Sequence, residues 1–280
     1  MKLEEHWQKD GSVLPLLTFP LLEQTRMVKH CFTTRMGGAS KGMFESLNLS
    51  FTRGDDEAAV KENYRRLADA LDVAPDGFVC SDQTHTTNIR KVTAEDRGKG
   101  VTRARDYTDI DGLMTDEPGL VLSTFYADCV PLYFVDPVHR AIGLSHSGWR
   151  GTVNRMGKAT LEAMHKEYGT DPADVVCAIG PSICQDCYEV SADVADAFAA
   201  EFAGHTDEIL IKKQNEKYQL DLWKANEIVL LDAGIQKSHL AVTDRCTCCN
   251  PQLLFSHRAS HGKRGNLGAF LCLLPNQKHI

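Results

Sequence analysis

The sequence predicts an α+β fold, a single domain over residues 1–280 with a mixed, largely antiparallel sheet and flanking helices. Three observations predict it. Helical and strand patterns are interspersed along the whole chain. In the middle of the chain, three strand patterns follow one another through short turns, which indicates antiparallel pairing rather than a doubly wound parallel sheet. No internal repeat and no linker rich in Pro, Gly or Ser divides the chain.

Four segments carry the apolar periodicity of amphipathic helices. They cover residues 55–71, 152–168, 191–203 and 221–234. The first begins with acidic residues, which suit the positive end of a helix dipole. The second ends before Gly169, a typical helix C-terminus. Ser191 and Asp221 are candidate N-caps of the third and fourth, because their side-chain oxygens can accept hydrogen bonds from free backbone N–H groups.

Strand patterns lie between these helices. They are Met27–Thr34, Phe78–Ser81, Asn88–Val92, Leu120–Tyr126, Pro131–Val135, Ala141–His146, Val175–Ile179, His239–Thr243 and Ala269–Leu274. The fourth, fifth and sixth form the helix-free group in the middle of the chain. We expect neighbours in this group to pair with each other.

Composition and charge exclude several classes of protein. The chain has 280 residues, 42% of them apolar, and a net charge of −7. An acidic total argues against a nucleic-acid binder, although it leaves room for a local basic pocket. The longest apolar stretch, residues 119–135, is interrupted by Asp128 and Pro131 and is too short to span a bilayer. The N-terminus lacks a signal-peptide pattern, so we expect a cytoplasmic protein without a membrane partner.

Ten cysteines are the unusual feature of the composition. In a reducing cytoplasm, most of them are expected to be buried apolar side chains. Cys184 and Cys187 have the spacing of a structural zinc pair, whereas Cys246, Cys248 and Cys249 form a group without regular spacing. A second metal site or a redox bridge is one interpretation of these five residues, and packing or loop cysteines are the preferred one.

Three reactive residues follow or end strand patterns: His85, Cys129 and His146. A sheet can bring such strand ends together. Two histidines and one cysteine, with a fourth position free for water, form the donor set of a catalytic zinc site, whereas structural sites use four protein ligands. Zinc lowers the pKa of its bound water toward about 7. The alternative is that each residue is simply part of a strand end.

The segment HSGWRGT begins at His146 and leads into the second predicted helix. Gly148 and Gly151 allow the backbone to approach a ligand closely. A helix N-terminus attracts anions, and Arg150 adds a bidentate donor for phosphate. The alternative is an ordinary helix start with a solvated arginine.

Ten motifs occur in this order along the chain: FTTRMGG, SLNLS, QTH, ADCVPL, HSGWRGT, AIGPSI, CYEV, DLWKAN, CTCCN and FSHR. This series resembles the YfiH/YlmD family of laccase-domain proteins, once labelled polyphenol oxidases. The resemblance that these motifs carry runs from about Phe32 to Leu274. The segments CTCCN and SHRASHGKRGN are closest to the YlmD-like branch. The sequence has QTH, SHR and GKR where many relatives have QVH, SYRR and TGR. The expected metal ligands are the same in this sequence and in those relatives, but residues expected in the wall of the substrate pocket differ.

The resemblance implies a YfiH-like domain with one Zn²⁺ per chain, held by His85, Cys129 and His146. It implies a purine nucleoside phosphorylase, which uses phosphate to cleave adenosine, inosine, guanosine or methylthioadenosine into the base and ribose 1-phosphate. It also implies adenosine deaminase activity, so that the expected enzyme is both a transferase and a hydrolase. Purine nucleosides and phosphate are the expected partners, and nucleic acid is not.

This chemistry suggests roles for further residues. Phosphorolysis needs an anion site, and the candidates for phosphate or substrate contact are Arg35, Arg150, Arg258 and Arg264. Arg258 and Arg264 could instead belong to a solvated surface loop. Asn48 is a candidate for a hydrogen bond to ribose, and capping of a turn is its alternative.

Deamination also needs a proton shuttle near the metal. Asp128 and Gln83 are the candidates closest in sequence to the expected ligands. Asp128 could equally orient a metal ligand from behind.

Three other functions compete with this interpretation. The same His/Cys/His set could hold a single copper in a phenol oxidase. Cys129 could be the nucleophile of a peptidoglycan-precursor-editing hydrolase without metal, with His146 or His85 as its base. A non-enzymatic protein with a structural zinc is the third.

Overall fold

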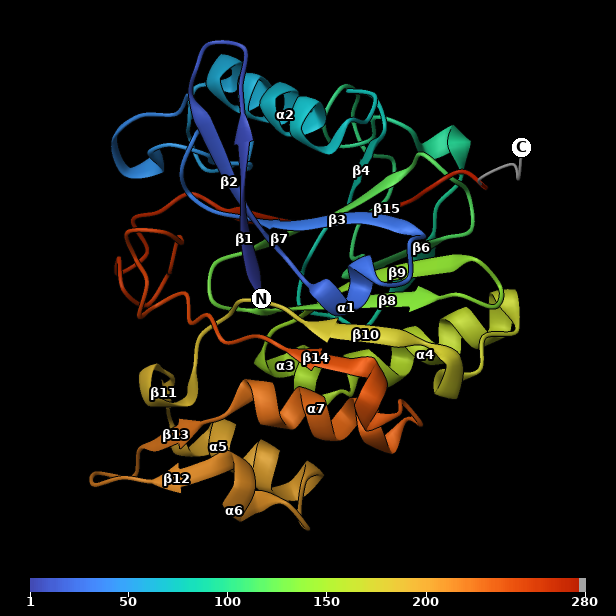
Figure 1. Cartoon of the computed structure of the whole chain (residues 1–280). Helices are drawn as coiled ribbons and strands as arrows, with labels where there is room; N and C mark the ends of the chain where they lie inside the picture. Colours follow the sequence, from blue (N-terminus) through green and yellow to red (C-terminus); the bar gives the residue numbers. More distant parts are fainter. Residues whose placement is uncertain (277–280) are drawn as a thin grey trace.

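The computed structural model describes residues 1–276 and has four main layers (Figure 1). Helix α2 (Glu57–Leu71) covers the outer face of one six-stranded sheet, a second six-stranded sheet lies beneath it, and helices α3, α4 and α7 cover the far side. Apolar cores fill the space between the two sheets and on the outer face of each. No helix in the described residues is long and apolar enough for a bilayer span.

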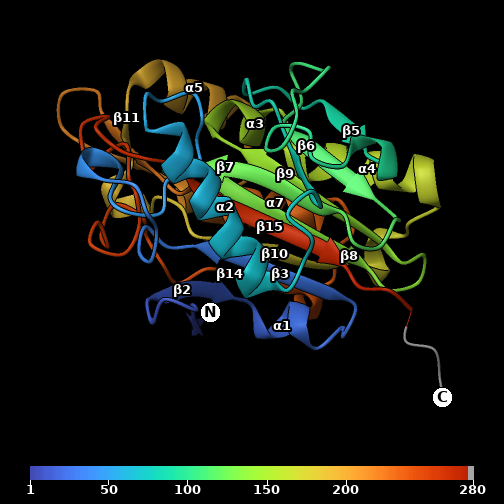
Figure 2. The same cartoon turned by 90° about the horizontal axis from the view of Figure 1, so that it is seen from above.

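The first sheet has the strand order β1-β2-β3-β15-β7-β4. Its strands are β1 (Lys2–Trp7), β2 (Val13–Thr18), β3 (Val28–Thr33), β15 (Leu267–Leu273), β7 (Val121–Tyr126) and β4 (Phe78–Cys80). All neighbours pair antiparallel except β4 and β7. The central strand β15 thus comes from the end of the described chain, and its neighbours β3 and β7 come from the first half (Figure 2).

The second sheet has the order β14-β10-β8-β9-β6-β5. Its strands are β14 (Leu240–Val242), β10 (Val176–Ile179), β8 (Val130–Asp136), β9 (Ala141–Ser147), β6 (Gly112–Thr115) and β5 (Ile89–Lys91). The edge pairs β10–β14 and β5–β6 are parallel, and the inner pairs are antiparallel. The prediction of mixed, largely antiparallel pairing is therefore confirmed, although the strands form separate sheets rather than one.

A third, three-stranded sheet lies beyond the helices and has the order β11-β13-β12. It consists of β11 (Glu189–Val190), β13 (Tyr218–Leu220) and β12 (Leu210–Lys212), with α5 (Ala192–Glu201) and the short α6 (Thr206–Ile209) beside it. These strands have little local sequence signal, because each has only two or three residues. The hairpin of β1 and β2, strand β6 and the four-residue helix α1 (Pro20–Glu23) were also not expected.

The predicted helices are present, with one change. Helix α2 begins after Asp56, whose carboxylate accepts a hydrogen bond from the N–H of Ala58. Helix α7 (Leu222–Asp232) begins after Asp221, which caps it as expected through the N–H of Lys224. The segment 152–168, expected to be one helix, is instead α3 (Trp149–Val153) followed by α4 (Met156–Tyr168). Arg155 adopts a left-handed conformation between them and interrupts the helix.

One expectation about the middle strands is wrong. Strands β8 and β9 pair antiparallel as predicted, but β7 and β8 belong to different sheets. The chain crosses from the first sheet to the second at residues 127–129, and Asp128 has a positive φ of 88° in this crossing. The crossing places Cys129 directly before β8 and beside the end of β9.

Candidate metal centre and active-site cavity

His85, Cys129 and His146 come together as predicted at one end of the two sheets. The ligand-type atoms of all three lie within 4.8 Å of one another. The register of β8 with β9 pairs Val130 with Ser147, which places Cys129 beside the end of β9 and thus beside His146. His85 comes from the loop after β4, where it adopts a left-handed φ of 68°.

Asp111 positions both histidines. Its carboxylate lies 2.7 Å from Nδ1 of His146, which leaves Nε2 of that ring free to face the cluster. The same carboxylate accepts hydrogen bonds from the backbone N–H groups of Thr84, His85 and Thr86, at 2.9 to 3.1 Å. Asp111 is fully buried. A carboxylate behind a histidine is the usual partner that fixes the tautomer and orientation of a metal-ligating ring.

Gly148 leaves the space that the cluster occupies. A Cβ atom at this position would lie 2.9 Å from Cδ2 of His85 and 3.1 Å from Sγ of Cys129. The prediction of a close approach at Gly148 therefore has a steric basis, although it is the side chains of the cluster that approach. A Cβ at Gly151 would make only ordinary contacts, the nearest at 3.5 Å.

The three side chains also influence one another's charge. Burial opposes ionisation of the Cys129 thiol, but His146 and His85 outweigh it and lower its pKa to about 6. Burial likewise opposes protonation of His146, but the Cys129 thiolate and Asp111 raise its pKa to about 9. Thiolate and neutral imidazole are the ligating forms, so a divalent cation would replace the proton that these groups share.

The donor set and its surroundings fit a zinc ion. Two imidazoles and one thiolate provide three ligands, and all three residues line a cavity that leaves a fourth position accessible. Within residues 1–276, the other group with metal-binding geometry consists of cysteines alone. Neither group offers the clustered histidines that several coppers require.

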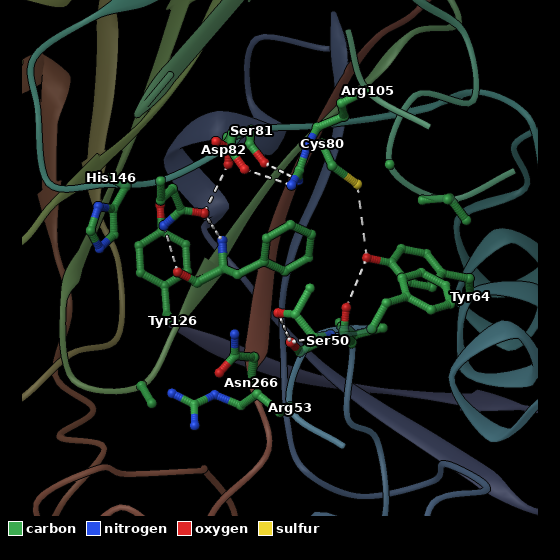
Figure 3. Close-up of a pocket in the computed structure, with 18 of the residues that line it drawn as sticks. Ser50, Arg53, Tyr64, Cys80, Ser81, Asp82, Arg105, Tyr126, His146 and Asn266 are labelled. Atoms are coloured by element: carbon green, nitrogen blue, oxygen red, sulfur yellow. Dashed lines mark hydrogen bonds and ion pairs between the residues drawn. The ribbon is translucent and has the colours of Figure 1, made fainter. Parts of the chain in front are cut away.

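The cavity has a volume of about 630 Å³, enough for a small organic ligand. Figure 3 shows Tyr126 and His146 on one side, Arg105 above, and Arg53 and Asn266 below. The aromatic residues Phe51 and Phe125 also line it. Arg105 is held in place by Asp82 at 2.6 Å and by the carbonyl of Ser81 at 2.7 Å.

Arg264 and Arg53 line the cavity together with Arg103 and Arg105, and Arg105 is already paired with Asp82. Nε of Arg264 is buried and has no hydrogen-bond partner within the described residues. Burial and the nearby charge of Arg53 lower the pKa of Arg264 to about 10. Nη1 of Arg264 donates to the carbonyl of Gly265 and to the side chain of Asn266. The charges of Arg53 and Arg264 in one cavity wall favour binding of an anion.

The other predicted substrate-binding residues lie outside the cavity lining. Arg35 donates to the carbonyls of Glu45 and Pro251 at 2.9 Å. Asn48 is buried and bonds to Asp55 and to the backbone of Ser50 and Asn266.

Arg150 and Arg258 both lie near Tyr188 and outside the cavity lining. Arg150 is exposed, and its guanidinium lies 4.2 Å from the ring centre of Trp149. Arg258 donates to the carbonyls of Cys187 and Glu189. Of the four predicted arginines, Arg264 alone lines the cavity.

The two expected proton shuttles make hydrogen bonds within the protein. Asp128 accepts from the hydroxyl of Thr247 at 2.6 Å and from the N–H of Arg258 at 2.7 Å. Gln83 lines the cavity, but its amide bonds to the backbone of Phe125 and to Ser81. These contacts favour positioning roles: Asp128 fixes the C-terminal loop, and Gln83 joins the His85 loop to β7.

Sequence reasoning missed Asp111 and Arg53. Asp111 lies in the segment DIDG, which resembles many surface turns, and its contact with His146 depends on the pairing of β6 with β9. Arg53 follows the SLNLS motif in a short turn. The available signal was its position three residues after the last residue of this motif, with Phe51 and Thr52 between them.

The comparisons with known proteins agree with this architecture. The family model described as "Multi-copper polyphenol oxidoreductase laccase" matches residues 29–274. The crystal structure of the Bacillus licheniformis hypothetical protein YfiH is 34% identical, covers 96% of this chain and 98% of its own, and has a TM-score of 0.87. The fold is thus that of a laccase-domain protein.

Two relatives carry names for activities. Purine nucleoside phosphorylase YlmD of Geobacillus stearothermophilus is 40% identical over 243 residues, which are 85% of this chain and 88% of that protein. Adenosine deaminase RL5, from an unknown prokaryotic organism, is 33% identical over 227 residues, 81% of this chain and 86% of that protein. The chain belongs to the YfiH/YlmD family of laccase-domain proteins, whose named relatives support its status as an enzyme.

Proposed function

We propose that the chain is a zinc-dependent purine nucleoside phosphorylase that also deaminates adenosine. The observation that carries the proposal is the position of Arg264. In this proposal, Arg264 and Arg53 form the anion site, because both line the cavity that also contains His85, Cys129 and His146. The names of the relatives support the same pair of activities.

The rest of the cavity suits a nucleoside. Phe51, Phe125 and Tyr126 provide aromatic surface for a purine ring, and Asn266 and Asp82 provide polar groups that can bond to a ribose. Arg53 and Arg264 would then hold phosphate against the sugar. Uncompensated cationic groups stabilise the transferring phosphate without a change of geometry during the reaction.

In the proposed phosphorolysis, a phosphate oxygen bonds to C1′ of the ribose while the bond from C1′ to the purine nitrogen breaks. The bonding electrons leave with the base, which takes up a proton, and ribose 1-phosphate remains. In deamination, water replaces the amino group at C6 and ammonia leaves. A zinc ion held by His85, Cys129 and His146 would supply an activated water for this second reaction. Asp111 would keep His146 oriented toward the metal.

The test is incubation of the purified, zinc-loaded protein with adenosine, inosine, guanosine and methylthioadenosine, with and without inorganic phosphate. The proposal expects free base and ribose 1-phosphate only when phosphate is present, and inosine from adenosine in either case. Absence of phosphate-dependent cleavage across all four nucleosides would overturn the phosphorylase assignment.

Metal analysis of the same preparation tests the cofactor. We expect zinc at the His/Cys/His cluster, and stoichiometric copper would favour the single-copper phenol oxidase. Rapid alkylation of Cys129 in the metal-loaded protein would favour the thiol hydrolase, because a ligated sulfur is protected. We propose a cytoplasmic location, since all ten cysteines are free thiols in the structure and suit a reducing compartment.

A further inference from the structure

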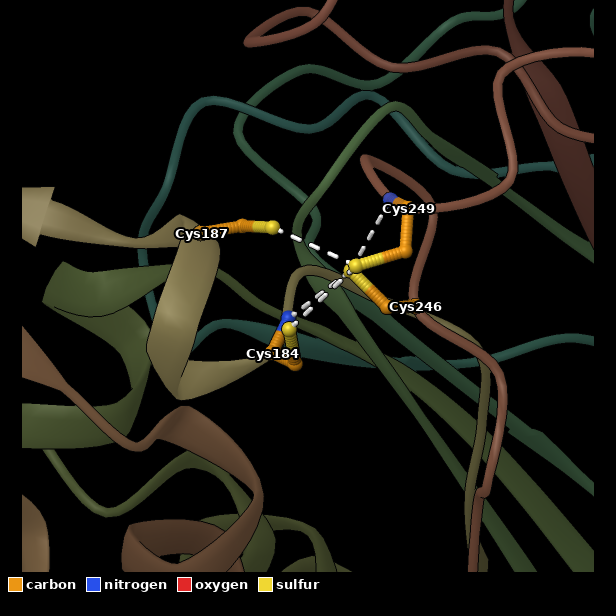
Figure 4. A group of neighbouring side chains, drawn as sticks. All are labelled: Cys184, Cys187, Cys246 and Cys249. Carbon is orange, nitrogen blue, oxygen red and sulfur yellow. Dashed lines mark hydrogen bonds between the residues drawn. The ribbon is translucent and has the colours of Figure 1, made fainter.

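A second cluster of cysteines lies away from the cavity, where two segments distant in sequence meet (Figure 4). Cys184 directly precedes the short turn Gln185–Cys187 before β11, and Cys187 ends it. Cys246 and Cys249 lie in the loop after β14. Their four sulfur atoms all lie within 4.8 Å of one another. Sγ of Cys249 is 3.4 Å from that of Cys187 and 3.9 Å from that of Cys184.

These distances match a tetrahedral metal site. Zinc–sulfur bonds of about 2.3 Å place neighbouring sulfurs about 3.8 Å apart in a tetrahedron. The sequence spacing also fits once the pairs are correctly divided. Cys184 and Cys187 form one C-x-x-C pair, and Cys246 and Cys249 form a second. Cys248 lies inside the second pair and is not part of the four-sulfur group. Paired C-x-x-C motifs from two segments are the usual ligand pattern of zinc ribbons.

Backbone amides already stabilise negative charge in this cluster. Sγ of Cys246 accepts hydrogen bonds from the N–H of Cys184 at 3.3 Å and from the N–H of Cys249 at 3.4 Å. Four thiolates around one divalent cation leave a net charge of −2, so N–H donors directed at sulfur are the support that such a site requires. Ordinary packing cysteines do not need these contacts.

We propose that Cys184, Cys187, Cys246 and Cys249 bind a zinc ion in a closed, four-thiolate structural site, separate from the His85–Cys129–His146 cluster. With all four positions filled by protein, no position is free for substrate, so the site acts on the fold rather than on the chemistry.

The proposed site would fasten two loops beside the active-site crossing. Thr247, inside the second pair, bonds to Asp128, and the N–H of Ile183, next to the first pair, donates to the carbonyl of Asp128. Asp128 directly precedes Cys129. The zinc would therefore hold the surroundings of the catalytic cluster in place, although it contacts no reacting atom.

Metal stoichiometry tests the proposal on the full-length protein without an affinity tag, prepared with a thiol reductant in zinc-containing medium. Native mass spectrometry and elemental analysis should find two zinc equivalents in the wild type. Cys249→Ser and Cys129→Ala should each lose one, and Cys248→Ser, the matched control, should keep both. A single equivalent in the wild type that depends on Cys129 would overturn the proposal, and so would stoichiometric iron at the second site or loss of zinc from Cys248→Ser.

Cobalt substitution provides a readout that needs no Cys249 variant to fold. Co²⁺ bound by four thiolates gives intense sulfur-to-metal charge-transfer and tetrahedral d–d absorption. Cys129→Ala retains all four proposed ligands, so it should show both bands after titration with one equivalent of Co²⁺. Their absence from reduced Cys129→Ala, or a Cys187–Cys249 disulfide in wild type purified under reducing conditions, would refute the site. These results do not depend on phosphorylase activity, so they can fail or succeed separately from the proposed function.

Discussion

The two cysteine-containing clusters differ in how the fold builds them. His85, Cys129 and His146 are held by the ends of paired strands and by a loop tied to the buried Asp111. Cys184, Cys187, Cys246 and Cys249 lie in turns and loops outside the sheets. The first cluster opens onto a cavity of about 630 Å³, whereas the second lies where two loops meet, with Cys249 exposed at the surface.

This difference predicts a different role for a metal ion in each cluster. Strand register and a buried carboxylate fix the first cluster without any ion, so three ligands suffice and the fourth position can serve chemistry. The loops of the second cluster have few sheet hydrogen bonds to hold them, and a four-ligand crosslink would replace those bonds. We therefore expect substitutions at the first cluster to affect turnover and substitutions at the second to affect stability.

The largest expected effect is that of Cys129→Ala. Loss of the thiolate leaves two histidines, and we expect one zinc equivalent to be lost and turnover to fall to background. Cys249→Ser should lose a zinc equivalent too, but it should keep most of its activity at low temperature and unfold at a lower temperature. Steady-state kinetics and thermal unfolding of both variants measure this contrast. A Cys129→Ala protein that remains active after losing this zinc equivalent would contradict the mechanism.

Asp111→Asn should have the next largest effect. Its carboxylate is the partner of His146 and of three backbone N–H groups in the His85 loop. Removing the carboxylate behind a metal-ligating histidine typically costs about 10- to 100-fold in metal affinity or activity. We expect a loss of this size in a zinc titration monitored by activity, with the Cys184 cluster still loaded. Unchanged zinc affinity would show that Asp111 only stabilises the loop.

Arg264→Gln should raise KM for phosphate by about tenfold or more, because a hydrogen bond to a charged group contributes about 1.5–3 kcal/mol. Deamination uses no phosphate, so its rate should change much less. Arg150→Gln is the matched control, since Arg150 is exposed and lies outside the cavity lining. If instead only Arg150→Gln raises the KM for phosphate, the phosphate site lies at the start of helix α3 and the assignment to Arg264 is wrong.

The sequence was sufficient for the elements with strong local patterns. Long apolar strands such as β8, β9 and β15 and capped helices such as α2 and α7 have signals within a few residues. The separation of the strands into two sheets depends on the crossing at Asp128, where one residue with a positive φ turns the chain between layers. No periodicity encodes this crossing, because the flanking strands are equally apolar.

Prediction of the candidate site from the sequence has the same limit, because contacts between distant segments have no local pattern. His85, Cys129 and His146 follow or end strand patterns and carry distinctive motifs, so the sequence could group them. Asp111 could not be grouped with them, because its role arises from tertiary contacts across 26 and 35 residues of chain. The second C-x-x-C pair was present in the sequence but was obscured by Cys248, which makes the group appear irregular.

The smallest expected effect is a loss of folding stability in acid that comes from His30. It would add to any change in stability caused by the two metal clusters at low pH, so it must be measured separately. His30 is buried, and its Nε2 accepts a hydrogen bond from the N–H of Phe19 at 2.8 Å. Burial lowers the pKa of His30 from 6.5 to about 4. Between these values the unfolded chain binds a proton that the folded chain does not, so the free energy of unfolding should fall by about 1.4 kcal/mol per pH unit as pH decreases.

Urea unfolding of wild type and His30→Gln at pH 7 and pH 5 measures this. His30→Gln should lose less stability than the wild type between pH 7 and pH 5. Zinc release affects both proteins alike and therefore cancels in this comparison. An equal loss of stability in the wild type and the variant would contradict the assignment to His30.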